Sequence, residues 1–158
     1  MKILVCVDGS ESALDAVRHA LHLHREGLQA SFVLATVQEP TFVYEMILAP
    51  DAEVLERVTG AVGGRALKAA EALLEAAGVP FEREIGTGDP ALTLLDVAAR
   101  HRCAAIIMGA RGMGALRSAL LGSVSQEVLR DSPLPVTIVK HLIADEESGK
   151  VAQALAAS

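Results

Sequence analysis

A glycine-rich segment followed by serines contains the residue types most suited to chemistry. Three glycines, at 109, 112 and 114, precede a Gly122-Ser123 pair where the pattern predicts that a helix begins. Glycines let backbone amides approach an anion because no Cβ intervenes. The first N–H groups of a helix are unpaired, and the helix dipole favours a phosphate there. The segment therefore predicts phosphate binding. Four side chains add possible donors: Arg111, Arg117, Ser123 and Ser125.

Each feature also has an ordinary structural explanation. A glycine cluster after a strand usually forms a tight turn, and a serine that opens a helix is usually only a cap. Their occurrence together favours phosphate binding. Two other phosphate loops are excluded. A P-loop requires a lysine before its Ser or Thr, but here Gly122 precedes Ser123. A dinucleotide fingerprint requires G-x-G-x-x-G after the first strand, where this chain has Asp8-Gly9-Ser10.

Hydrophobic patterns predict the elements that position this segment. A first helix would be capped by Ser10 or Ser12 and ended by Gly27, and Asp89 would cap a later one. Gly86-Thr87-Gly88 would turn the chain before Asp89. Residues 38–60 fit a loop, a lid or a short helix. Strands are predicted at 3–7, 31–37, 81–85 (an edge strand), 104–108 and 136–139, and further helices at about 65–77, 90–102 and 123–130.

This alternation of strands and helices predicts a single α/β domain, residues 1–141, with an open five-stranded parallel sheet and helices on both faces. A short tail, 142–158, would follow it. Open α/β sheets bind ligands beyond the carboxyl ends of their strands, where the strand order reverses. Asp8 follows the first strand and Gly109 ends the fourth. If those strands are neighbours, both residues line one crevice.

Composition excludes several classes of function. The net charge of −6 argues against nucleic acid or an anionic membrane as the main partner. No apolar stretch is long enough to span a membrane, and the start shows no signal-peptide organisation. Cys6 and Cys103 lie in or beside apolar strands, as buried inert thiols do, so a cytoplasmic protein is expected. The histidines at 19, 22 and 24 favour packing or solvation over a metal site.

The spacing Gly109-x2-Gly112-x9-Gly122-Ser123 resembles the ATP-binding signature of the universal stress protein family. Further resemblance covers roughly residues 1–140, including the motifs at 7–10, 88–90, 106–109 and 135–140. The resemblance implies a Rossmann-like sheet of strand order 3-2-1-4-5 and a homodimer through Val136–Val139. It also implies a nucleotide-dependent stress-response or regulatory module that binds ATP, with Mg²⁺ held through the phosphates.

The same resemblance assigns residues to parts of the nucleotide. Asp8, Thr36 and Val37 would lie beside the adenosine, although the usual His-Val of the second strand reads Ala35-Thr36 here. The ribose and phosphates would follow Met108, Gly109 and Gly112, with charge from Arg111. The phosphates would be held by Gly122, Ser123, Val124 and Ser125.

Two alternative functions remain open: a slow ATPase or nucleotidyl-transferring enzyme, and a binder of another adenine nucleotide such as cyclic AMP. The glycine segment contains no His, Cys or Lys to act as nucleophile or base, and arginine cannot serve. No catalytic residue is therefore assigned. A binding protein with at most slow hydrolysis is expected.

Overall fold

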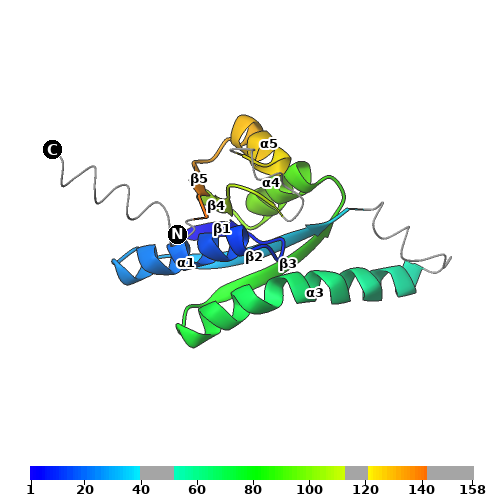
Figure 1. Cartoon of the computed structure of the whole chain (residues 1–158), viewed down its shortest axis with the longest axis horizontal. Helices are drawn as coiled ribbons and strands as arrows, with labels where there is room; N and C mark the ends of the chain where they lie inside the picture. Colours follow the sequence, from blue (N-terminus) through cyan, green and yellow to red (C-terminus); the bar gives the residue numbers. More distant parts are fainter. Residues whose placement is uncertain (40–51, 113–120, 142–158) are drawn as a thin grey trace.

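The computed structural model describes residues 1–39, 52–112 and 121–141. Figure 1 shows a central sheet with helices on both of its faces. The elements follow in the order β1 (Lys2–Cys6), α1 (Glu11–Arg25), β2 (Ser31–Gln38), α3 (Ala52–Ala76), β3 (Phe81–Thr87), α4 (Pro90–Arg100), β4 (Ala105–Gly109), α5 (Ser123–Asp131) and β5 (Val136–Val139). The tail predicted at 142–158 lies outside the described residues.

The five strands form one parallel sheet in the order β3-β2-β1-β4-β5. This confirms the predicted fold, including the edge position of β3. Val5 in the central strand β1 pairs with Leu34 of β2 and Ile107 of β4. The strand order reverses between β1 and β4, so the condition for a shared crevice is met.

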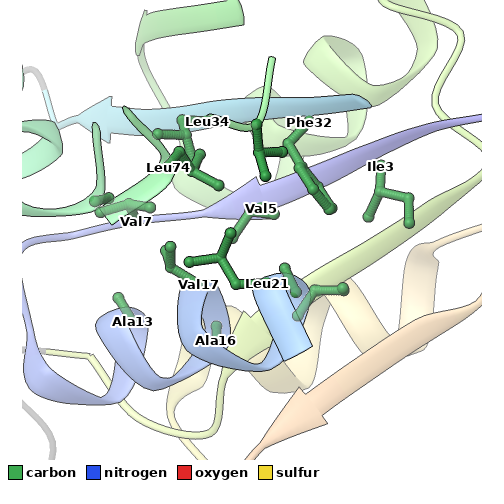
Figure 2. Close-up of a cluster of buried hydrophobic side chains, with 14 of the residues drawn as sticks. Ile3, Val5, Val7, Ala13, Ala16, Val17, Leu21, Phe32, Leu34 and Leu74 are labelled. Carbon is green, nitrogen blue, oxygen red and sulfur yellow. The ribbon is translucent and has the colours of Figure 1, made fainter. Parts of the chain in front are cut away.

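Alternate residues of the central strands face two separate apolar layers. Ile3 and Val5 of β1 and Phe32 of β2 pack with α1 and α3. Figure 2 shows Val17 and Leu21 of α1 pointing toward these strands. Leu4, Cys6 and Val33 instead pack with α4 and α5 on the other face. Burial on both faces explains why β1 and β2 are continuous apolar runs rather than alternating ones.

The predicted turn at 86–88 is wrong in its first two residues. Gly86 and Thr87 belong to β3 and pair with Val37 and Gln38 of β2. Only Gly88, whose φ is +134°, takes a conformation that favours glycine. Strand pairing that continues to the last residue of β2 overrides the local turn signal.

Two predicted helix boundaries also change. The helix expected from residue 65 begins at Ala52, so α3 includes three glycines. At Gly63 a Cβ would lie 2.6 Å from Ile85 Cγ2, so this glycine lets α3 approach β3 closely. The structure thus resolves part of the segment left open at 38–60, while 40–51 lies outside the described residues. Helix α4 ends at Arg100 rather than near Arg102, which has a φ of +54°.

The helices differ in how they begin. Ser10, not Ser12, caps α1, because its hydroxyl accepts the Ala13 N–H at 3.1 Å. Asp89 caps α4 and accepts the Leu92 N–H at 2.9 Å. Gly122 precedes α5 and makes no side-chain cap. All three helices begin just beyond a strand, at the edge of the sheet where a ligand would bind.

Candidate functional site

A cavity of about 570 Å³ opens at the carboxyl ends of β1, β2 and β4. The structure brings together in its wall every residue that the sequence analysis assigned to a ligand: Asp8, Thr36, Val37, Met108, Gly109, Arg111, Gly112, Gly122, Ser123, Val124 and Ser125. Gly114 and Arg117, also named there, lie outside the described residues.

Other residues complete the wall that the sequence analysis did not assign: Cys6, Val7, Ala13, Ala35, Glu39, Pro90, Leu94 and Leu121. Two of them, Pro90 and Leu94, come from the first turns of α4. The motif at 88–90 marked this helix start but not its distance from the loop after β4. Cys6 and Ala35 could have been placed from pairing alone, because Cys6 ends β1 and Ala35 is its register partner in β2.

Gly109 is close-packed against α1 rather than open to the cavity on its Cα side. A Cβ there would lie 2.6 Å from the Ser12 carbonyl oxygen and 2.7 Å from its carbonyl carbon. Real Cβ atoms do not approach backbone so closely, so any larger residue would displace α1 or β4. Gly109 is therefore required by the fold itself.

Gly112 lies against a carboxylate. A Cβ there would lie 2.8 Å from Asp8 Oδ2. The other oxygen of this carboxylate, Oδ1, accepts the Ser10 N–H at 2.9 Å, which fixes the side chain at the end of β1. The absence of a Cβ at 112 therefore brings the loop backbone next to Asp8.

Gly122 has more room than the other two glycines. A Cβ there would lie 3.5 Å from Arg111 Cα and from Gly112 N, which is ordinary van der Waals contact. Its φ of −72° and ψ of 162° are open to any residue. The Gly122 N–H donates to the Ala110 carbonyl oxygen at 2.7 Å. The two ends of the loop after β4 therefore meet, and the fold alone does not demand glycine at 122.

The serines of α5 differ in their surroundings. Ser123 is exposed at the cavity, next to Val124. Ser125 is only 3% exposed, and its hydroxyl donates to the carbonyl oxygens of Gly109 at 3.0 Å and Ala110 at 3.3 Å. The hydroxyl proton of Ser125 is thus directed at the backbone of β4.

Charges in the cavity wall are few and mixed, with Asp8, Glu39 and Arg111 contributing them. A smaller hollow of about 270 Å³ adjoins the cavity at Ser123 and contains Glu39, Asp89 and Glu127. Burial, followed by smaller effects of Cys103 and Asp8, raises the pKa of the Cys6 thiol to about 12. Cys6 is therefore protonated at neutral pH and does not act as a nucleophile.

In the described part of the chain, no group of three His, Cys, Asp or Glu side chains is arranged to hold a metal ion. The ring of His24 packs edge-on against Phe32, with centroids 6.3 Å apart. Packing is one of the two roles, packing or solvation, that the sequence favoured for this histidine. Within residues 1–39, 52–112 and 121–141, no helix has the length and apolar character needed to cross a membrane.

The family model described as the universal stress protein family matches residues 1–140. The chain belongs to the universal stress protein family. A universal stress protein of Methanocaldococcus jannaschii is 30% identical over 139 residues, which cover 88% of this chain and 81% of that protein. One from Bacillus subtilis is 30% identical over 146 residues, with 88% and 98% covered.

Solved structures of universal stress proteins share this fold. A universal stress protein in complex with cAMP superposes with a TM-score of 0.64 and 28% identity, covering 88% of this chain and 96% of that one. Family membership accounts for the strand order of the sheet.

Proposed function

We propose that this universal stress protein binds ATP in the cavity, as a member of the ATP-binding subgroup. The observation that carries the proposal is the uncapped start of α5, which opens onto a cavity of nucleotide size. The glycine spacing of that subgroup lies along the same wall. The complex of a related universal stress protein with cAMP supports an adenine nucleotide as the ligand class.

The phosphates would lie at the N-terminus of α5. Its first N–H groups receive no side-chain cap from Gly122, and the helix dipole adds positive potential there. The hydroxyl of Ser123 is exposed beside them, and Arg111 is in the same wall. A bound phosphate would supply the acceptors that a capping side chain supplies elsewhere.

The adenosine would lie over the ends of β1 and β2. The wall there is formed by the small or apolar side chains of Cys6, Ala35 and Val37, which suit a flat base. Thr36, 2% exposed, is part of the same wall. Asp8 at the end of β1 offers a carboxylate acceptor for an amino or hydroxyl group of the nucleoside.

We also propose that Mg²⁺ enters with the nucleotide. Mg²⁺ commonly retains several waters and is bound through substrate phosphates with only one or two carboxylates. Asp8 and Glu39 are carboxylates of the cavity wall. This mode needs no dedicated protein cage.

Binding without efficient turnover is the activity that we propose. The thiol of Cys6 is held protonated, and the described wall contains neither His nor Lys. A carboxylate such as Asp8 could at most orient a water, which would give slow hydrolysis. The protein would then act as a nucleotide-dependent regulatory module in a stress response, in the cytoplasm where free Cys6 and Cys103 stay reduced.

A homodimer through β5 completes the proposal. Val136–Val139 forms one edge of the sheet, and Val136, Ile138 and Val139 are only partly buried. An edge strand with unpaired backbone groups and partly exposed apolar side chains can pair with a second copy. Sedimentation equilibrium tests this, since a monomer at micromolar concentration would contradict it.

The ligand is tested on the purified protein. We expect denaturation to release an adenine nucleotide that chromatography identifies, and equilibrium dialysis with Mg²⁺ to show saturable ATP binding. Absence of both would overturn the proposal. Competition with cyclic AMP distinguishes the alternative ligand, because a site selective for it would bind cyclic AMP more tightly than ATP.

A further inference from the structure

Two buried serines hold the end of β4 from opposite faces of the sheet. Ser12 of α1 accepts the Arg111 N–H on its hydroxyl oxygen at 3.4 Å. Ser125 of α5 donates its hydroxyl to the carbonyl oxygens of Gly109 and Ala110 at 3.0 and 3.3 Å. We call this pair, Ser12 and Ser125, the serine clamp.

The clamped segment connects directly to the start of α5. The Ala110 carbonyl oxygen also accepts the Gly122 N–H at 2.7 Å, so one peptide group contacts both Ser125 and the residue before α5. On the other face, Gly109 packs closely against the Ser12 backbone. The segment therefore cannot move toward α1, because it would clash with that backbone. Displacement of Gly109–Arg111 would therefore also move Gly122.

We propose that Ser12 and Ser125 are positioning residues, which fix the uncapped start of α5 in the orientation that receives the ligand. This rests on the proposed function. A serine hydroxyl has one proton, and that of Ser125 is directed at backbone carbonyls. Ser125 thus acts through the β4 backbone and not by donating to the phosphate, whereas Ser12 acts without being part of the cavity wall.

A double-mutant cycle tests the clamp. Ser12→Ala and Ser125→Ala remove only a hydroxyl, so neither introduces a clash. We expect each to weaken ATP binding about three- to tenfold, the range of one lost hydrogen bond. The double variant should bind about as weakly as the worse single one, because breaking either side releases the same segment. Urea unfolding of all variants separates this loss from global stability.

Ser123→Ala is the matched control, since this serine is in the same helix turn but outside the clamp. Its fold-change in ATP affinity should multiply with that of Ser12→Ala in the double variant, because the two serines act independently. If Ser125 instead contacted the phosphate directly, the fold-losses of ATP affinity caused by Ser12→Ala and Ser125→Ala would also multiply. That result would overturn the proposal. Unchanged affinity in both single variants would overturn it as well.

Amide hydrogen exchange of the ligand-free protein provides a readout that does not depend on nucleotide binding. We expect Ser125→Ala to speed exchange at Arg111, whose own partner Ser12 is intact, and Ser12→Ala to speed exchange at Gly122. The coupling between the two serines would be disproved if Ser125→Ala left exchange at Arg111 unchanged and Ser12→Ala left exchange at Gly122 unchanged. If the wild-type protein bound no ATP while this cross-effect was present, the proposed function would fail and the clamp would stand.

Discussion

Helices α4 and α5 begin at the same edge of the sheet but leave their first N–H groups in different states. At α4, Pro90 has no N–H, and the carboxylate of Asp89 accepts that of Leu92. At α5, Gly122 has no side chain to offer. Both helix starts contribute residues to the cavity. The protein itself caps the start of α4 and leaves the start of α5 without a side-chain cap.

Giving α5 the cap of α4 should have the largest effect. In Gly122→Asp, the new carboxylate would accept the N–H groups proposed to hold phosphate and would repel it. We expect ATP affinity to fall about 100-fold, equivalent to about 2.7 kcal/mol, as for loss of charge-assisted hydrogen bonds. The free energy of unfolding should stay level or rise by a few tenths of a kcal/mol. Isothermal titration calorimetry and urea unfolding measure the two quantities.

The control for this variant is Gly122→Ala, which adds a Cβ in ordinary contact distance and no acceptor. Its ATP affinity should stay within about threefold of wild type, because only a methyl group is added. Full ATP affinity in Gly122→Asp would show that the phosphates lie elsewhere.

Removing the cap of α4 should lower the stability of the fold and leave ATP affinity nearly unchanged, the opposite of the Gly122→Asp result. The expected change in free energy is also smaller. In Asp89→Ala the Leu92 N–H loses its acceptor, so we expect the free energy of unfolding to fall by about 1 kcal/mol. ATP affinity should change by less than about threefold, since Asp89 lies in the adjoining hollow and not in the main cavity. Asp89→Asn retains an acceptor and should unfold like wild type. A large loss of ATP affinity in Asp89→Ala would contradict the division between the two helices.

The smallest expected effect is on the pH dependence of stability. It concerns Glu82 of β3, which forms ion pairs with Lys2 of β1 and with His101 just after α4. A hydrogen bond from Lys2 at 2.6 Å, and then His101 after α4, lower the pKa of Glu82 below its usual value. When folding lowers the pKa of a carboxyl group, the group stabilises the folded state at pH values above its unfolded-state pKa. This stabilisation is lost as the pH falls through the folded-state pKa. Thermal unfolding between pH 5 and 3 should therefore show a smaller loss of Tm in Glu82→Gln than in wild type. Equal losses would show that the ion pair is inconsequential.

Much of the architecture was predictable because local signals and burial agreed. The apolar runs of β1 and β4 and the caps at Ser10 and Asp89 each have a local cause that the structure retains. Gly86 and Thr87 were misread because a turn signal there is overridden by pairing with β2. The early start of α3 was missed because three glycines made the helix start uncertain, and the tertiary contact that explains Gly63, its approach to Ile85, leaves no local signal.

The sequence predicted the parts of the candidate site that lie in one local segment, but not the residues that distant helices contribute to it. The spacing from Gly109 to Ser125 identified the loop, and strand order placed Asp8 beside it. Pro90 and Leu94 were missed because no local pattern reports which helix start faces the cavity. The role of Ser12 was also missed, since its partner is the backbone of a segment nearly a hundred residues away.

The close packing of Gly109 bears on how the signature should be read in other sequences. Because Gly109 is needed for α1 to cross β4, a relative that binds no nucleotide still has reason to keep it. Gly122 has space and an unstrained backbone, so only the proposed ligand would penalise a capping or bulkier residue there. In a newly sequenced relative, the first glycine therefore reports the architecture, and a capping or bulky residue at the position of Gly122 would argue against the nucleotide binding proposed for this protein.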